Sequence, residues 1–207
     1  MPAHVDVYFT LMSPWAYLGH DPLVALASKH GFTIGWKPVV LPALFEETGG
    51  LPLAKRAIQR RRYRDVELQR WAALRGRKLN PRPKHWPFDP SLADRAVIAL
   101  LGAGKNPAGF IGSGFRAAWA EERDLGSRDV VAALIDAQGF AAAATLEAAD
   151  DVVAQEAYRA NRDAAIAAGV FGSPSYVLDG EVFWGQDRLD LLDAMLTGGR
   201  APFRPIE

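Results

Sequence analysis

The first 40 residues place a strand, a helix and a second strand in direct succession, and this opening limits the folds available to the chain. Residues 4–10 alternate apolar and polar side chains, as a half-buried β-strand does. Ser13 and Pro14 follow, and serine is a favoured helix N-cap while proline is a favoured first helical residue. The predicted helix ends at Gly31, and residues 32–40 give the second extended segment. A βαβ unit therefore opens the chain.

The remainder of the chain is predicted to be helical until a hairpin close to its end. From residue 53 to residue 168 the apolar spacing is almost entirely helical, apart from a proline-rich irregular loop at 80–90. Residues 175–178 and 181–184 then flank Asp179-Gly180, a strong signal for a two-residue hairpin turn. A last helix is predicted over residues 187–196.

This order of elements predicts an α/β protein with a thioredoxin-like fold, in which a helical domain is inserted between the βαβ half and the β-hairpin/α half; other α/β domains share the same order. The predicted division assigns residues 1–42 and 166–207 to the thioredoxin-like domain and residues 43–165 to the inserted all-helical domain. The aromatic side chains expected in the core are Trp36, Tyr63, Phe110, Phe115 and Trp119.

Charge and hydropathy exclude several classes of function. The 207 residues carry no net charge, but residues 1–120 hold 17 Lys/Arg against 8 Asp/Glu, and residues 121–207 hold 7 against 16. This pattern argues against a nucleic-acid binder with one basic face and suggests that an anionic ligand is handled by the first half. No apolar run is long enough to span a membrane and no signal peptide is recognisable, so a cytoplasmic protein without a membrane partner is expected.

The chain has no cysteine, which rules out disulfides, thiolate metal sites and any thiol nucleophile of its own. A disulfide oxidoreductase is therefore excluded. No metal is expected either, because the four histidines lack the spacing of metal ligands: they stand at positions 4, 20, 30 and 85.

Three separated motifs, in this order along the chain, carry a resemblance to a known family. They are Leu11-Met12-Ser13-Pro14-Trp15-Ala16-Tyr17-Leu18, Gly169-Val170-Phe171-Gly172-Ser173-Pro174-Ser175 and Phe183-Trp184-Gly185-Gln186-Asp187-Arg188-Leu189. Together they resemble the 2-hydroxychromene-2-carboxylate isomerase family, which is related to kappa-class glutathione transferases and shares the DsbA-like thioredoxin fold. The resemblance covers essentially the whole chain.

The resemblance implies an isomerase with glutathione as cofactor and a small aromatic keto acid as substrate. The implied reaction interconverts 2-hydroxychromene-2-carboxylate and trans-o-hydroxybenzylidenepyruvate, or related compounds, through addition of the glutathione thiolate, rotation about a carbon–carbon bond and elimination of glutathione. Redox members of this fold carry Cys-Pro-x-Cys after the first strand, where this chain has Ser13, Pro14, Trp15 and Ala16. The thiolate must therefore come from outside the protein.

Ser13 has two interpretations. Its hydroxyl can cap the helix by accepting a backbone N–H. It can also donate a hydrogen bond to the glutathione sulfur and, with the helix dipole, lower the pKa of that thiol from about 8.5 towards neutrality. The resemblance implies the second interpretation, with Ser13 as the catalytic residue.

Ser173 and Pro174 stand where thioredoxin-like folds place a cis proline. A cis bond there exposes the backbone of Ser173, whose N–H and C=O can then pair with a bound peptide. The resemblance implies that Ser173 and Pro174 hold the cysteinyl part of glutathione. An ordinary turn is the alternative.

The segment Trp184, Gly185, Gln186 and Asp187 opens the last predicted helix. The resemblance implies that this segment contacts glutathione, with Gln186 and Asp187 facing the γ-glutamyl end. Asp187 can also act simply as the helix N-cap, and the two roles are compatible.

On the substrate side, Ala54 and Lys55 fall where the family has substrate-contacting residues, and His85 and Trp86 fall where a substrate-contacting aromatic residue is expected. His85 is a candidate proton donor. The sequence departs from the family at Ala54, where an asparagine is common, and near Phe45-Glu46, where a lysine is common. The cations of residues 54–64 can supply one partner to a substrate carboxylate or form a solvated helix face: Lys55, Arg56, Arg60, Arg61, Arg62 and Arg64.

Two other functions fit the same residues. A kappa-like glutathione transferase would form stable conjugates and consume glutathione. A redox-inert, thioredoxin-fold peptide-binding module would keep the site at Pro174 without catalysis. A homodimer is expected because relatives of this fold are often dimers.

Overall fold

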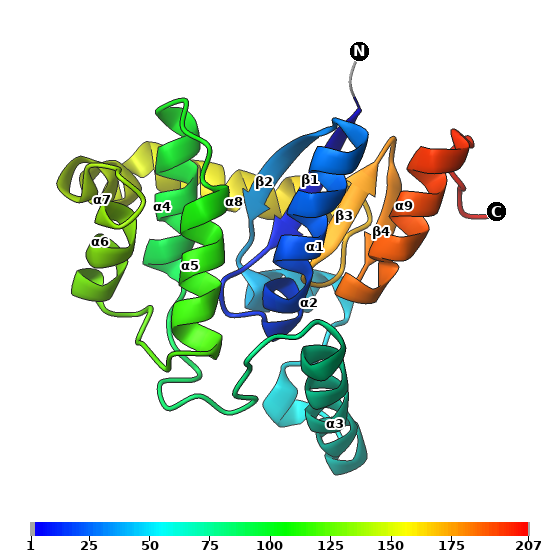
Figure 1. Ribbon diagram of the computed structural model, residues 1–207, viewed down its shortest axis with the longest axis horizontal. Helices are drawn as coiled ribbons and strands as arrows, with labels where there is room; N and C mark the ends of the chain where they lie inside the picture. The colour runs from blue at the N-terminus through cyan, green and yellow to red at the C-terminus, as the bar shows by residue number, and fades with distance from the viewer. Residues whose placement is uncertain (1–2, 207) are drawn as a thin grey trace.

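The computed structural model describes residues 3–206 and shows a four-stranded mixed sheet with helices on both faces (Figure 1). The strands lie in the order β2-β1-β3-β4. β1 pairs in parallel with β2, antiparallel with β3, and β3 pairs antiparallel with β4. Their bounds are His4–Phe9 for β1, Thr33–Pro38 for β2, Ser175–Leu178 for β3 and Glu181–Trp184 for β4. The predicted βαβ opening and the predicted hairpin are confirmed.

Alternate residues of the strands feed two apolar layers, because successive side chains of a strand point to opposite faces. On one face, Val7 of β1 packs in the main hydrophobic cluster with residues of α1 (Pro14–His30) and α9 (Leu189–Gly198). On the other face, Tyr8 packs in a second cluster with residues of α2 (Leu41–Thr48) and α8 (Val152–Ala167). The sheet is thus the middle layer of three.

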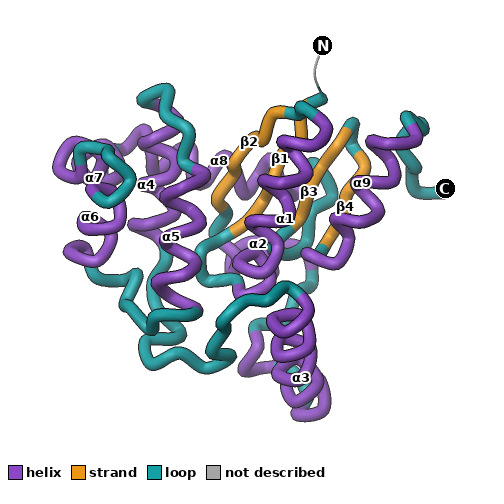
Figure 2. Tube along the Cα trace, in the orientation of Figure 1, coloured by secondary structure: helices purple, strands orange, loops and turns teal. Residues whose placement is uncertain are grey.

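Four further helices gather beside the β2 edge of the sheet, on the left of Figure 1. They are α4 (Ser91–Gly102), α5 (Ala108–Trp119), α6 (Arg128–Asp136) and α7 (Ala142–Asp150). A 3-10 turn at Leu53–Lys55 leads to α3 (Ile58–Leu74), which lies below the lower end of α1. The predicted irregular loop is confirmed; it belongs to the long connection that crosses from α3 to α4 (Figure 2).

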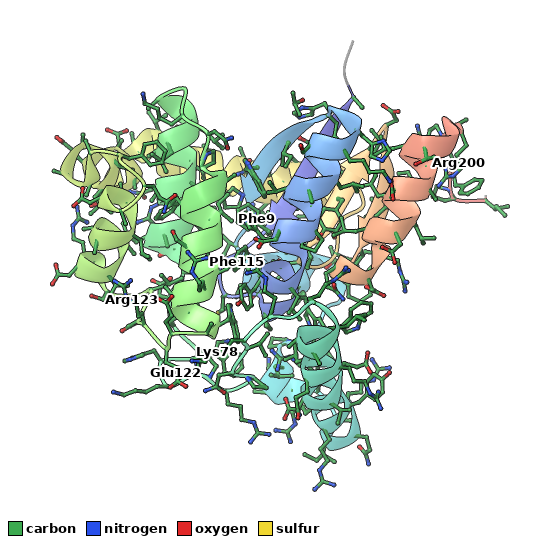
Figure 3. The ribbon with its side chains drawn as sticks, viewed as in Figure 1. Phe9, Lys78, Phe115, Glu122, Arg123 and Arg200 are labelled. Carbon is green, nitrogen blue, oxygen red and sulfur yellow. The ribbon has the colours of Figure 1, made fainter. Side chains whose placement is uncertain are left out.

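The main cluster joins the sheet to these helices. Phe9 of β1 and Phe115 of α5 point toward one another, with 6.1 Å between their ring centroids (Figure 3). Four of the five predicted core aromatics are buried, but the prediction for Tyr63 is wrong: it is 62% exposed on the outer side of α3, which packs against α1 through Leu68 and Ala72 instead. The division into domains at residues 43 and 165 stays a prediction.

The last helix begins later than expected. A 3-10 turn, Gln186–Arg188, precedes α9, whose N-terminus is not capped by any side-chain hydrogen bond. The expectation that Asp187 caps this helix is therefore wrong. Its carboxylate instead pairs with the neighbouring Arg188, at 3.0 Å.

Candidate active site

Ser13 lies at the end of the turn that joins the central strand β1 to α1. It is the N-cap of α1, as predicted: its extended backbone (φ −93°, ψ 114°) precedes Pro14, and its Oγ accepts a hydrogen bond from the Ala16 N–H at 3.2 Å. The first turn of α1 holds no acidic side chain. The positive end of the helix dipole is therefore not neutralised at this point.

The loop that carries Pro174 meets Ser13 directly. The Ser173–Pro174 peptide bond is cis. The Ser13 hydroxyl donates to the Ser173 carbonyl oxygen at 3.1 Å, and the Ser173 Oγ accepts from the Thr10 N–H at 3.2 Å. Two motifs 160 residues apart thus form one site. The backbone carbonyl of Ser173 accepts from Ser13, whereas the backbone N–H of Ser173 has no hydrogen-bond partner among residues 3–206.

Asp94 of α4 holds the turn between β1 and α1 through hydrogen bonds to Thr10 and Leu11. The sequence motifs did not predict this role. Its side chain is fully buried. Oδ1 accepts from the Leu11 N–H at 3.0 Å, and Oδ2 accepts from the Thr10 hydroxyl at 2.7 Å and from the Tyr158 hydroxyl at 2.8 Å. Burial raises the pKa of Asp94 to about 7, although the three hydrogen bonds act in the opposite direction. The two residues that Asp94 holds come just before Met12 and Ser13.

The segment after β4 closes the other side of the site. The Gly185 N–H donates to the Pro174 carbonyl at 2.9 Å, so this segment is attached to the cis-proline loop. Gln186 is buried against α1, which Gly19 permits: a Cβ at position 19 would lie 2.9 Å from the Gln186 Cβ and 2.5 Å from the Tyr176 hydroxyl. The Gln186 Nε2 has no hydrogen-bond partner within the described residues.

Arg75, at the C-terminus of α3, donates hydrogen bonds to the side chain of Gln186. The sequence motifs did not predict this contact either. Its Nε and Nη2 donate to the Gln186 Oε1 at 3.2 and 3.1 Å, and its guanidinium lies 5.4 Å from the centre of the Trp71 ring. The loop after Arg75 continues along α1, where the Lys78 carbonyl accepts from the Tyr17 hydroxyl at 2.9 Å. Lys78 lies on the connection that passes below the helices (Figure 3). α3 and this loop therefore form a wall beside the start of α1.

A cavity of about 380 Å³ lies away from Ser13. It runs along β4 and α9 to Arg200 and Phe203. Arg200 lies near the C-terminus of the chain, well away from Lys78 and the lower end of α1 (Figure 3). Trp184 lines this cavity and is 52% exposed. Its ring packs edge-on against that of Phe171, with 4.7 Å between the ring centroids. Trp184 therefore faces a different surface from the buried Gln186, two residues later.

The four substrate-side candidates lie in two places. Ala54 and Lys55 are exposed on the 3-10 turn before α3. His85 is partly exposed, with its Nδ1 3.8 Å from an Asp124 carboxylate oxygen. Trp86 packs against the main core, and its Nε1 is buried with no acceptor among residues 3–206. Of these four, only Trp86 has both a buried face and an unused polar atom.

Two classes of site find no support in the described part of the chain. Residues 3–206 contain no group of three or more His, Cys, Asp or Glu side chains placed to hold a metal ion. None of the helices described is both long and apolar enough to cross a membrane.

Fold and site together define a DsbA-like thioredoxin-fold protein that lacks the redox cysteines. The family model described as DSBA-like thioredoxin domain matches residues 4–197. A cytosolic disulfide reductase from Pseudomonas aeruginosa, DsbM, shares the fold with a TM-score of 0.69 at 19% identity, covering 95% of this chain and 98% of that one. The predicted fold class is confirmed.

Closer relatives narrow the assignment. The chain is 29% identical to the 2-hydroxychromene-2-carboxylate isomerase of Sphingobium xenophagum, over 95% of this chain and 99% of the relative. It is 30% identical to the enzyme of that name from Pseudomonas putida, over 93% of each. A solved 2-hydroxychromene-2-carboxylate isomerase superposes with a TM-score of 0.80 at 29% identity, covering 94% of this chain and 95% of that one. The chain belongs to the 2-hydroxychromene-2-carboxylate isomerase family and is an isomerase, as the three motifs predicted.

Proposed function

We propose that this isomerase uses glutathione to interconvert 2-hydroxychromene-2-carboxylate and trans-o-hydroxybenzylidenepyruvate, or closely related aromatic keto acids. The observation that carries the proposal is the contact between Ser13 and Ser173. The Ser13 hydroxyl lies at the N-terminus of a helix whose first turn has no acidic side chain. It contacts a cis-proline loop, and the chain has no cysteine. This arrangement keeps the anion-stabilising geometry of a thiol-handling fold and requires the thiol to come from another molecule.

The polar groups around Ser13 fit a glutathione peptide. The Ser173 N–H lacks a protein acceptor in the described chain and suits the backbone carbonyl of a peptide laid alongside it. The Gln186 Nε2 is a buried donor without an acceptor, and such donors are costly unless a ligand or water satisfies them. A peptide that carries carboxylates and carbonyls would supply acceptors to both.

In this proposal the protein binds, orients and stabilises charge. Glutathione, when bound, supplies a thiolate whose reversible addition to the substrate permits rotation about a carbon–carbon bond. Ser13 turns its hydroxyl proton from the Ser173 carbonyl to the sulfur, and the start of α1 adds the field of its dipole. Asp94 keeps Thr10 and Leu11, and through them Ser13, in place. Aromatic-compound catabolism is the setting that this chemistry implies.

The first prediction concerns binding. Reduced glutathione should bind saturably in a calorimetric titration, and the far-ultraviolet absorbance of a thiolate should grow at a pH below the pKa of the free thiol, about 8.5. S-methylglutathione is the matched control, since it keeps the peptide but cannot form a thiolate, and it should bind without that absorbance. An absence of binding at millimolar glutathione would overturn the proposal and favour the redox-inert peptide-binding module.

Turnover separates the isomerase from the transferase. With 2-hydroxychromene-2-carboxylate, the concentration of free thiol should be the same before and after complete isomerisation. Steady loss of thiol with this substrate, or rapid conjugation of a chlorodinitrobenzene, would favour the kappa-like glutathione transferase.

A second prediction tests the support of Gln186. Arg75→Met removes both donors to the Gln186 Oε1, and should weaken glutathione binding about tenfold, as expected for the loss of a charge-assisted hydrogen bond. Arg70→Met is the control, because Arg70 lies on the same helix and, among residues 3–206, pairs only with Glu67 one turn earlier. Equal glutathione affinities in the two variants, measured by calorimetry, would show that Gln186 takes no part in the cofactor site.

Assembly and location belong to the same proposal. We infer a homodimer from the resemblance, and the cytoplasmic location expected from the sequence belongs to the same proposal. Sedimentation equilibrium tests the dimer: a mass near 22.5 kDa would contradict it.

A further inference from the structure

We propose that Arg64 of α3 binds the carboxylate of the aromatic keto-acid substrate, with Trp86 holding its guanidinium in place. This inference rests on the proposed function for the identity of the substrate. The sequence offers six cations in residues 54–64 and no means to choose among them. Their environments in the fold distinguish them.

Five of the six cations are solvated or already engaged. Lys55, Arg60, Arg61 and Arg62 are exposed. Arg56 donates its Nε to the Leu51 carbonyl at 2.7 Å and lies over the Phe45 ring at 6.0 Å. Arg60, Arg61 and Arg62 form an ordinary solvated face of α3, and Lys55 and Arg56 lie on the turn before it.

Arg64 is different because its side chain is largely buried and none of the residues 3–206 lies within hydrogen-bond distance of its guanidinium. Its side chain is only 12% exposed, yet it makes no hydrogen bond to any residue of 3–206. Its ion pair with the neighbouring Asp65 is long, 3.6 Å from Nη1 to Oδ1, and the other oxygen of Asp65, Oδ2, accepts from Arg82 at 2.6 Å. Burial lowers the pKa of Arg64; the negative charge of Asp65 acts in the opposite direction, and the positive charges of Arg56 and Arg82 add to the lowering. A buried guanidinium is normally paired, and its fixed fork of donors matches a carboxylate.

A second unused donor lies beside it. The Arg64 Cζ is 5.9 Å from the centre of the Trp86 ring, so the guanidinium lies against the indole. The Trp86 Nε1 is itself buried and has no acceptor within the described chain. Two neighbouring donor groups that make no hydrogen bond within residues 3–206 are the complement of an oxygen-rich anionic ligand.

The position of Arg64 on α3 places this pair beside the start of α1. Residues four apart share one face of a helix, so Arg64 shares the face of Leu68. Leu68 is fully buried in a cluster with Leu18 and Trp15 of the first turns of α1. Side chains of a helix also lean toward its N-terminus, so Arg64 covers the surface one turn before this contact. Arg64 therefore lies on the face of α3 that packs against the first turns of α1, the helix that Ser13 caps.

The test measures recognition of a carboxylate without any turnover. The probes are o-hydroxycinnamate, a stable aromatic acid with the substrate's carboxylate and phenol, and its neutral amide, o-hydroxycinnamamide, both titrated by calorimetry in the absence of glutathione. The wild-type protein should bind the acid about 10- to 100-fold more tightly than the amide, the range expected for a charge-assisted pair. Arg64→Gln should reduce this preference to near unity, and Arg64→Lys should retain part of it.

Arg61→Gln is the matched control, because it removes an exposed cation from the same helix and should keep the wild-type preference. An acid-to-amide preference that survives in Arg64→Gln, or that is absent in the wild type, would overturn the inference. Failure of glutathione to bind would defeat the proposed function but leave this preference measurable. Normal isomerisation by Arg64→Gln, with an unchanged KM for the acid, would defeat the role of Arg64 and leave the proposed function standing.

Discussion

Ser13→Ala should lower kcat/KM for 2-hydroxychromene-2-carboxylate by about 10²- to 10³-fold, the loss that follows removal of one preorganised donor to a developing or bound anion. The Ser13 hydroxyl now donates its hydrogen bond to the Ser173 carbonyl, and by rotating it can donate to a bound sulfur atom instead. Without it the pKa of the bound thiol should rise. The acid limb of the pH profile of kcat/KM should therefore move to higher pH, because more alkaline solution is needed to form the same fraction of thiolate.

The same substitution also removes a helix cap, which by itself costs about 0.5–2 kcal/mol of stability. Asp151→Ala is the matched control, because Asp151 caps α8 by accepting the Val153 N–H at 2.8 Å and lies outside the site. Both variants should lose similar stability in thermal unfolding, and only Ser13→Ala should lose activity. Equal activities in the two variants would mean that Ser13 is a cap and nothing more.

Local signals predicted the parts of the fold that depend on neighbouring residues. Ser13 and Pro14 begin α1 where the dipeptide indicated. Asp179 and Gly180 adopt the positive φ angles, 50° and 79°, that a two-residue hairpin turn requires. Tyr63 and Asp187 were placed wrongly, because the direction of α3 and the 3-10 turn before α9 are decided by contacts with distant elements.

The site was predicted only as far as the motifs reach. Ser13 contacts Ser173, and the segment of Gln186 is attached to Pro174 through Gly185, so the three motifs adjoin; their role in binding stays a prediction, and Arg75 and Asp94 belong to no motif. Arg75 is one arginine among many in a basic stretch, and only the packing of α3 shows that it reaches Gln186. The sequence does contain a signal for Asp94. It is the one carboxylate among the buried positions of α4, next to Ala93 and three residues before Val97, and a carboxylate at a buried position is rare.

The pH dependence of stability should carry the mark of Asp94. An aspartate in an unfolded chain has a pKa of about 3.9, whereas burial raises that of Asp94 to about 7. Between these values the folded protein binds one proton more than the unfolded chain, so the contribution of this group to the free energy of unfolding falls as the pH rises from about 4 to about 7. Asp94→Asn cannot ionise and should remove this part of the slope, measured by denaturant unfolding at pH 5 and pH 8. Asp129→Asn, at an exposed carboxylate, should keep the wild-type slope.

Asp94→Leu should have the larger effect on stability, about 3–9 kcal/mol, because it leaves the Leu11 N–H and the hydroxyls of Thr10 and Tyr158 without their shared acceptor at about 1–3 kcal/mol each. That is a large part of the 5–15 kcal/mol typical of a native protein. Asp94→Asn should lose far less, since its carbonyl still accepts from Leu11 and its amide can donate to the two hydroxyls. Both variants are compared with the wild type by denaturant unfolding and by glutathione titration. If Asp94→Leu unfolds at the wild-type denaturant concentration, the carboxylate does not organise the turn that presents Ser13. If it is unstable but Asp94→Asn binds glutathione normally, hydrogen bonding at this position, rather than charge, is what holds the site in shape.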